Sequence, residues 1–125
     1  MQIPADLRYS SDHEWARAQG DVVRVGITDY AQDALGDVVY VALPSVGSAL
    51  EAGAALGEVE STKSVSEIYA PVSGTVSAVN DALTSSPELI NSEPYEGGWI
   101  CEITTTSREG FDALLDAEAY KALTT

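Results

Sequence analysis

The sequence has few cations, and that shortage limits the partners it can have. Of its 125 residues, six are Lys or Arg and 20 are Asp or Glu, which gives a net charge of −14. A chain this acidic cannot offer the basic stripe that neutralises nucleic-acid phosphates, so we expect no nucleic-acid partner. Strong net charge instead favours a soluble monomer that docks on electropositive surfaces.

The scarcity of cysteine and of long apolar runs bears on the compartment. Cys101 is the one cysteine, so no intramolecular disulfide can form, and it lies in the apolar stretch WICEI, where we expect a small buried side chain. The first residues, MQIPADLRYSSDHEW, lack the pattern of a targeting peptide, and no segment approaches the ~20 apolar residues of a membrane span. We therefore expect a bacterial cytoplasmic protein without membrane contact.

The first third of the chain predicts strands and one short helix. Its length and its apolar fraction of 45% favour a single ordered domain over residues 1–125. Residues 13–27 read as two strands around a polar turn. Thr28 as N-cap and Gly36 after the last turn favour a helix over 29–35.

The rest of the chain predicts further strands, a loop and a terminal helix. Strands are expected near 37–44, 54–61, 64–70, 75–79 and 99–106. Residues 80–98 are rich in Pro, Gly, Ser and Asn and read as a long loop with about one helical turn. Apolar residues at helical spacing predict an amphipathic helix over 107–125, which we expect to cap the sheets.

Two pairs of segments resemble each other within the chain. GDVVYV from Gly36 matches GTVSAV from Gly74 at an offset of 38 residues, and LGEVES from Leu56 matches ICEITT from Ile100 at an offset of 44. Each half then holds two strands in the same order, which predicts two similar antiparallel sheets related by a pseudo-twofold. Chance similarity between β-branched runs is the alternative explanation.

The stretch ESTKSVSEIYAPVSG places Lys63, one of two lysines in the chain, between two expected strands. A lysine in a turn is usually only solvated. A single cation within an excess of acids does little for solubility, however, and a hairpin apex holds an amine far from the protein surface. Position alone therefore favours a solvated lysine, whereas the excess of acids and the specific APVSG turn that follows count against a role in solubility only.

These residues resemble a known family. GEVESTKSVSEIYAPVSGTV is similar to the lipoyl-lysine segment of the glycine cleavage system H-protein family, and YSSDHEW, VGITDYAQDALGDVVYVALPSVG, LINSEPYEGGW and the C-terminal helix match in the same order. The resemblance covers essentially the whole chain. It implies a mainly β, barrel-like sandwich of two antiparallel sheets of the lipoyl-domain type, with a short internal helix and a C-terminal helix, and a carrier rather than an enzyme.

The resemblance also implies a cofactor and four partners. Lipoate would be joined by an amide to Lys63, which removes the charge of the lysine. The arm would take the aminomethyl group of glycine from a pyridoxal-phosphate glycine decarboxylase to a folate-dependent aminomethyltransferase, and dihydrolipoyl dehydrogenase would reoxidise the dithiol. A lipoate-attaching enzyme would load the lysine.

Four further residues match functional positions of the family. Glu60 and Gly74 match positions that the lipoate-attaching enzyme recognises, although Glu60 could be a solvated carboxylate and Gly74 a glycine required by a turn. Glu14 and Glu67 match positions that line a cleft for the loaded arm, where carboxylates could hold its ammonium and limit hydrolysis. The simpler interpretation of both is an exposed charge on a strand.

The remaining polar residues suggest no catalytic or metal chemistry. His13 is the one histidine, which excludes a multi-histidine metal site and favours a structural hydrogen bond. The serines near Lys63 have no histidine base nearby in the sequence.

Other carriers and other functions remain open from the sequence. A biotinyl domain sets methionines beside its lysine, where this chain has Thr62 and Ser64. The lipoyl domains of 2-oxoacid dehydrogenases are shorter and lack the HEW and GITDYAQ regions. An interaction module that is never modified, or a lipoate store for other lipoyl proteins, is the alternative from a different functional class.

Overall fold

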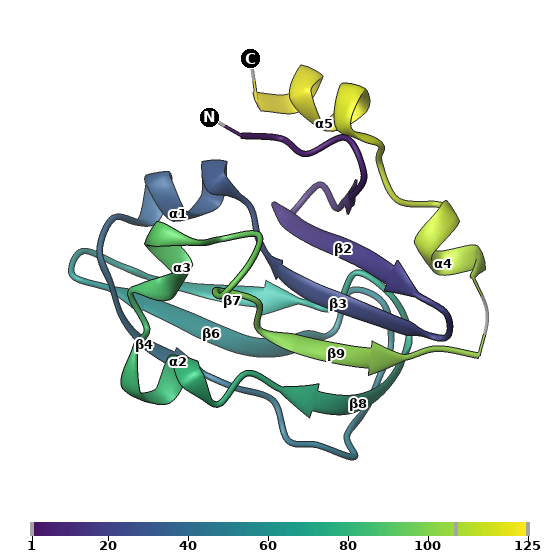
Figure 1. Cartoon of the computed structure of the whole chain (residues 1–125), viewed down its shortest axis with the longest axis horizontal. Helices are drawn as coiled ribbons and strands as arrows, with labels where there is room; N and C mark the ends of the chain where they lie inside the picture. The colour runs from purple at the N-terminus through teal and green to yellow at the C-terminus, as the bar shows by residue number, and fades with distance from the viewer. Residues whose placement is uncertain (1, 107, 125) are drawn as a thin grey trace.

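The computed structural model describes residues 2–106 and 108–124, and strands form most of its regular structure (Figure 1). The strands are β1 Arg8–Tyr9, β2 Glu14–Gln19, β3 Val22–Ile27, β4 Val38–Ala42, β5 Ala49–Leu50, β6 Ala55–Ser61, β7 Val65–Tyr69, β8 Gly74–Val79 and β9 Cys101–Thr104. The helices are α1 Asp29–Leu35, α2 Ala82–Ser85, α3 Leu89–Ser92, α4 Glu109–Asp112 and α5 Ala117–Thr124.

The strands form two antiparallel sheets. One has six strands in the order β1-β2-β3-β9-β8-β5, and the other has three in the order β4-β6-β7. The predicted mainly β fold with two antiparallel sheets is therefore confirmed. The sheets are unequal in size and stay separate rather than closing into a barrel.

Helix α1 begins and ends where local signals place it. The Thr28 side chain accepts a hydrogen bond from the backbone N–H of Ala31, at 3.2 Å, which satisfies one of the free donors at the helix start. Gly36 follows the last turn with a φ of 82°, a left-handed conformation that favours glycine, and donates to the carbonyl of Gln32. The helix predicted over residues 29–35 is confirmed.

The main core lies between the two sheets, because alternate side chains of each strand point to the same face. Val25 and Ile103 enter it from the six-stranded sheet, and Val59 and Ile68 enter it from the three-stranded sheet. Three short helices add Leu35, Leu83 and Ile90. Cys101 is buried in the same core, as its apolar surroundings predicted, and burial raises the pKa of its thiol to about 12.

A second cluster fixes both termini against the other face of the six-stranded sheet. Trp15, Tyr9, Tyr95 and Tyr120 are its buried aromatic members, and the rings of Tyr9 and Tyr120 stack with centroids 4.7 Å apart. Gly26 lies under the indole of Trp15, where a Cβ atom would come within 2.6 Å of the ring. Figure 1 accordingly shows the N-terminal segment beside α5.

The internal resemblance has a structural counterpart. The pair β4-β6 in the small sheet and the pair β8-β9 in the large sheet are both antiparallel. Each contains one register shift, between Val38 and Tyr40 in β4 and between Val76 and Ala78 in β8. These positions differ by 38 residues, which is the offset found in the sequence, so a bulge falls at the same place in both halves.

The offset between equivalent residues of β6 and β9 differs from the 44 residues predicted from the sequence. Val41 pairs with Val59 in the small sheet, and Val79 pairs with Cys101 in the large sheet. Equivalent residues of β6 and β9 are thus 42 positions apart, from 59 to 101, and the predicted offset of 44 is wrong by two. Two residues are one period of a strand, so the error leaves the inward and outward faces unchanged and is invisible in the apolar pattern.

The C-terminal segment forms two short helices, α4 and α5, instead of the single helix predicted over 107–125. Residues 107 and 125, the two ends of the predicted helix, lie outside the described residues. The interruption comes from Leu115, whose backbone N–H and C=O both pair with Tyr9 at 2.8 Å. Asp116 then begins the second helix, because its side chain accepts from the N–H of Ala119 at 2.9 Å. A tertiary bridge to β1 therefore overrides the helical periodicity.

Smaller differences concern short elements. The two-residue strands β1 and β5 were not predicted, because a pair of residues carries no alternation to detect. The loop predicted over 80–98 contains two short helices, α2 and α3, instead of one turn.

Candidate functional site

The hairpin between β6 and β7 presents Lys63 at its apex, exposed to solvent. The turn is ordered by Ser61, whose Oγ accepts hydrogen bonds from the backbone N–H groups of Lys63 at 3.3 Å and Ser64 at 3.1 Å. The N–H of Thr62 donates to the carbonyl of Asp37 at 3.1 Å, which fixes the tip to the start of β4. The lysine is therefore carried by a constrained turn.

The side chain of Lys63 runs past Gly36. A Cβ atom at this glycine would lie 3.3 Å from the Cε atom of Lys63 and 3.9 Å from its Nζ atom. Both salt bridges found within residues 2–106 and 108–124 involve arginines of the six-stranded sheet, and Lys63 is in neither. Its ammonium is therefore held beside the end of α1 without a neutralising carboxylate among the described residues.

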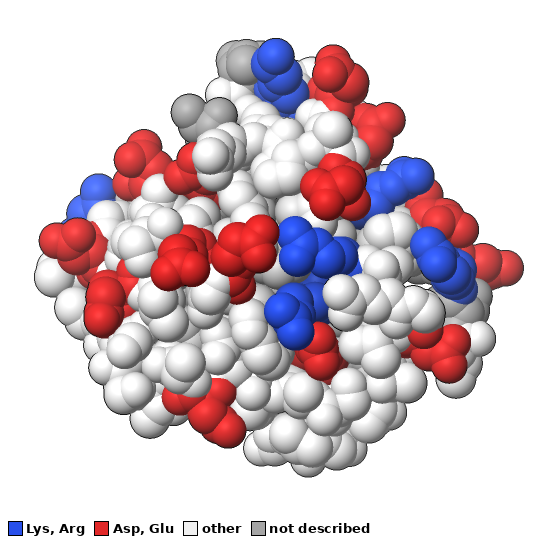
Figure 2. Space-filling view, in the orientation of Figure 1, with Lys and Arg blue, Asp and Glu red and all other residues white. Residues whose placement is uncertain are grey.

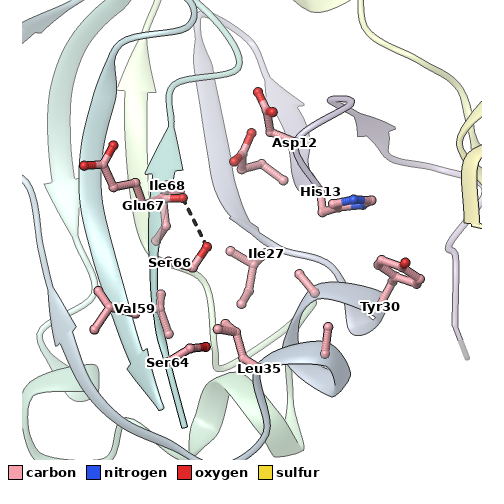
Figure 3. Close-up of a pocket in the computed structure, with 14 residues that line it drawn as sticks. Asp12, His13, Ile27, Tyr30, Leu35, Val59, Ser64, Ser66, Glu67 and Ile68 are labelled. Carbon is pink, nitrogen blue, oxygen red and sulfur yellow. Dashed lines mark hydrogen bonds between the residues drawn. The ribbon is translucent and has the colours of Figure 1, made fainter.

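A cleft of about 320 Å³ adjoins this hairpin (Figure 3). Its walls are largely aliphatic and come from four elements: Ile27 of β3, Leu35 of α1, Val59 of β6 and Ile68 of β7. Ser64, next to Lys63, lies at one end of the cleft, and Asp12 and His13 lie at the other. Glu14, which follows His13 in the chain, also lines the cleft. The cleft thus leads from the lysine toward a polar end.

Glu14 is the buried carboxyl of that polar end, with 2% of its surface exposed. Ser10 Oγ donates to its Oε1 at 2.5 Å, and the backbone N–H of Tyr69 donates to its Oε2 at 3.2 Å. Burial raises the pKa of Glu14 to about 7, because the two hydrogen bonds only partly offset the loss of hydration. A cation that entered the cleft would therefore find a carboxyl with no partner of opposite charge.

His13 forms part of the wall beside Glu14. Its backbone has a φ of 71°, and its Nδ1 is 2.8 Å from the hydroxyl of Tyr120, which in turn is 2.7 Å from Thr28 Oγ1. Its ring lies against Tyr30 with centroids 4.7 Å apart, and burial lowers its pKa. The structural role predicted for this histidine is confirmed, and the network joins the cleft to helices α1 and α5.

Glu67 borders the same cleft in a different way. Figure 3 shows its carboxylate pointing away from the cleft, whereas Ser66 points into it. Strand alternation explains the difference, since Ser66 and Ile68 share the inner face of β7 and Glu67 lies on the outer face. There its charge, together with a hydrogen bond, raises the pKa of Tyr69. Of the two carboxyls expected to hold the arm, that of Glu14 is buried in the lining of the cleft, and that of Glu67 points away from the cleft.

Glu60 and Gly74, the two expected recognition residues, lie far from each other. Glu60 is on β6 near Lys63, half-buried and paired across the sheet with Tyr40 and Val65. Gly74 starts β8, and Figure 1 places that start at the opposite end of the sheets from the hairpin tip.

A close approach to β9 accounts for the glycine at position 74. A Cβ atom there would collide with the carbonyl oxygen of Thr104 and would lie 2.7 Å from Ile103 Cγ2. Gly74 is therefore required by packing, whatever further role it has.

The basic side chains lie mostly away from the hairpin. Figure 2 shows most of them gathered over β2, β3 and α4, with acidic side chains spread over the rest of that face. Arg17 and Arg24 stand opposite each other on β2 and β3. Arg24 pairs with Glu102 at 2.9 Å, and Arg17 lies 3.9 Å from Glu96.

Residues 2–106 and 108–124 contain neither a helix able to cross a membrane nor a cluster of metal ligands. No helix there is long and apolar enough to cross a membrane. No group of three or more His, Cys, Asp or Glu side chains in the same ranges could hold a metal ion.

Comparisons with known proteins agree on one family. A family model described as glycine cleavage H-protein matches residues 7–125. The chain is 62% identical over 124 residues to the glycine cleavage system H protein of Micrococcus luteus, covering 98% of this chain and 97% of that protein. It is 58% identical over 128 residues to the protein of the same name from Mycobacterium avium, with the same coverage. The crystal structure of a glycine cleavage system H protein from Mycobacterium marinum superposes with a TM-score of 0.89, at 44% identity and 98% coverage of both chains.

Proposed function

The chain belongs to the glycine cleavage H-protein family of lipoyl carriers, and on that premise we propose that Lys63 is its lipoyl attachment site. The observation that carries the proposal is the exposed lysine on an ordered hairpin tip, next to an aliphatic cleft that ends at a buried carboxyl. Lys121, the other lysine, lies on α5 and lines a different hollow, whose one carboxyl, that of Glu118, is exposed. The chain then acts as a carrier and leaves the chemistry to its partners.

Attachment requires only the amine of Lys63 and an activated lipoyl acyl group. The unprotonated Nζ attacks the acyl carbonyl carbon, the bond from that carbon to its leaving group breaks, and a proton passes to solvent. The product is a neutral amide. The hydrogen bonds of Ser61 hold the turn in place during this reaction, so little of the hairpin has to be ordered when the enzyme binds.

The cleft suits a lipoyl arm in chemistry and in size. Its aliphatic walls can cover methylene groups, at about 0.8 kcal/mol for each CH₂ removed from water. Its volume of about 320 Å³ is at the lower end of the range for small-molecule sites. Ile27, Leu35, Val59 and Ile68 would hold the arm against the protein between encounters with partners.

When attached, the lipoyl group supplies a disulfide that accepts the aminomethyl carbon of glycine and becomes a dithiol once that carbon has been passed on. The cargo carries an ammonium, which the carboxylate of Glu14 would bind in the closed end of the cleft. Apolar walls around this pair would keep water from the cargo and slow the loss of ammonia. Glu67 borders the cleft and could join this pair only after its side chain turns inward.

The proposed partners are those of the glycine cleavage system. They are the pyridoxal-phosphate glycine decarboxylase, the aminomethyltransferase, dihydrolipoyl dehydrogenase and a lipoate-attaching enzyme that recognises Glu60 and Gly74. A tethered arm makes each transfer local, with the length of the arm setting its reach. The acidic surface would speed docking of a cytoplasmic monomer without holding its partners tightly.

Intact mass tests the attachment directly. Protein made in a lipoate-replete bacterial host should carry one lipoyl group, and peptide mapping should place it on Lys63. Lys63→Arg should carry none, while Lys121→Arg should be loaded as the wild type is. An unmodified wild-type chain, or an adduct on Lys121, would sink the proposal.

A further inference from the structure

The outer face of the three-stranded sheet carries two rows of side chains close to Lys63. Tyr40, Glu60 and Val65 form the row nearer the tip, because Tyr40 pairs with Glu60 and Glu60 pairs with Val65. Ala42, Glu58 and Glu67 form the next row in the same way. Side chains of paired residues share a face of the sheet, so these six project together, away from the core.

This face exposes apolar surface that the fold does not use. Tyr40 is 57% exposed and Val65 is 54% exposed. The register shift in β4 leaves Val39 next to them, also 53% exposed. Within residues 2–106 and 108–124, only Val46 and Leu123 are large apolar side chains of comparable exposure. Exposed apolar side chains in one cluster are characteristic of a surface that binds another protein.

The two rows of the outer face carry three carboxylates and no basic side chain. Glu60 lies within the apolar patch, and Glu58 and Glu67 stand directly opposite each other beside it. None of the three is in a salt bridge among the described residues. Like charges placed opposite each other on a sheet are destabilising, so this arrangement has a cost to the fold. It is complementary to a partner surface that combines apolar side chains with basic groups facing Glu60 and the pair of Glu58 and Glu67.

The patch lies close to the hairpin tip that carries the amine, since Val65 is two residues from Lys63. The tip is fixed to the start of β4 by the hydrogen bond from Thr62 to Asp37, and the side chain of Lys63 passes over Gly36. An enzyme seated on the patch would therefore have Nζ within reach. An enzyme that acts on the far end of a flexible arm has no need of a surface next to Nζ.

We propose that this outer face, in which Tyr40 and Val65 stand on either side of Glu60, with Val39 beside Tyr40 and with Glu58 and Glu67 in the adjoining row, docks the enzyme that acylates Lys63. The proposal rests on the proposed function, since it needs Lys63 to be the acylated residue. It gives Glu60 a place within a surface instead of a solitary role. It also assigns Glu67 to docking, in agreement with its outward carboxylate.

The test measures acylation of the unmodified protein by a purified ATP-dependent lipoate ligase. Initial rates from intact mass, at several concentrations of the chain, give kcat/KM for each variant. The double variant Tyr40→Ser with Val65→Ser should lower kcat/KM about tenfold, because two apolar contacts are lost. Val46→Ser is the matched control, an exposed valine outside the patch, and should leave kcat/KM unchanged. Thermal unfolding of each variant checks that the fold is intact.

A charge variant provides an independent measurement. Glu58→Gln with Glu67→Gln should lower kcat/KM at low salt and flatten its dependence on ionic strength, since steering by these carboxylates is lost. An unchanged kcat/KM in both folded double variants would overturn the docking proposal while leaving Lys63 as the attachment site. Failure to acylate the wild type at Lys63 would overturn both proposals.

A further experiment distinguishes a surface that is specific to the acylating enzyme from a surface that binds partners in general. Fully lipoylated wild type and the Tyr40→Ser, Val65→Ser variant are compared as substrates of dihydrolipoyl dehydrogenase. Equal rates support a face specific to the acylating enzyme. An equal tenfold loss would show a general docking surface and overturn the assignment.

Discussion

The two faces of strand β7 place similar residues in opposite surroundings. On the inner face, Ile68 and Ser66 line the cleft that also includes the buried Glu14. On the outer face, Val65 and Glu67 lie in solvent. A strand two residues past Lys63 thus presents one surface suited to an arm and another suited to a partner protein. The comparison shows that distance from the lysine along the chain says little about which task a residue can serve.

The largest contrast should appear in folding stability. Ile68→Ala should lower the free energy of unfolding by about 2–5 kcal/mol, because it leaves a cavity in a core position that is 1% exposed. Val65→Ala, on the outer face, should change it by less than about 0.5 kcal/mol. Urea denaturation followed by tryptophan fluorescence measures both. Similar losses for the two variants would mean that the outer face is buried against something in the free protein.

The pH dependence of stability should distinguish the two carboxyls. The pKa of Glu14 in the folded chain is about 7, above the ordinary 4.5, so the folded state retains a proton that the unfolded state loses between these values. Stability should therefore fall as pH rises from about 4.5 to 7, by on the order of 3 kcal/mol from this group.

Glu14→Gln should remove that fall, and Glu67→Gln should keep it. Urea unfolding at a series of pH values provides the measurement. A wild-type curve with the same slope as the Glu14→Gln curve would contradict the burial of Glu14.

The rate at which the loaded arm loses ammonia should depend on Glu14, which is buried, and not on Glu67, which points outward. Glu14→Gln should raise the rate of ammonia release from the aminomethyl-loaded protein about tenfold, the loss expected for one charge-assisted hydrogen bond. Glu67→Gln should leave that rate close to wild type, because its carboxylate points away from the cleft. Ammonia release from isolated loaded protein provides the measurement. Equal effects of the two variants would show that Glu67 turns inward when the arm is loaded.

The smallest effect concerns the facing carboxylates of the outer face. Glu67→Gln should raise the free energy of unfolding by a few tenths of a kcal/mol at pH 7, since it removes repulsion from Glu58 across the sheet. The gain should shrink in high salt. Chemical denaturation at two salt concentrations, with Glu51→Gln as an exposed control, checks it. A loss of stability would instead show that the hydrogen bond between Glu67 and Tyr69 outweighs this repulsion.

Local signals in the sequence accounted for much of the fold. Helix α1 was predicted residue for residue because Thr28 and Gly36 act on their immediate neighbours. The hairpin that carries Lys63 was predicted from two expected strands, 54–61 and 64–70, on either side of a short polar turn. Where a distant segment decides the outcome, prediction failed. The backbone bridge between Leu115 and Tyr9 divides the terminal helix, and no local pattern announces it.

Prediction of how the side chains of the candidate site are placed was limited for the same reason, because contacts between distant segments determine that placement. The burial of Glu14 results from packing of β2 against β7, and a charged residue on a strand gives no sign of it. The outward direction of Glu67 follows from the alternation around Ile68, whereas its expected place in the cleft comes from family resemblance alone. The apolar patch depends on the register of three strands and on a bulge in β4, which the sequence does not specify.

Methyl NMR of the unmodified and lipoylated proteins tests most directly whether the arm attached to Lys63 lies in the inner cleft. We predict that lipoylation shifts the methyl resonances of Ile27, Leu35 and Ile68 and leaves those of Val46 and Leu123, outside the cleft, in place. Shifts confined to Val39 and Val65 on the outer face, with the cleft resonances unchanged, would contradict the account.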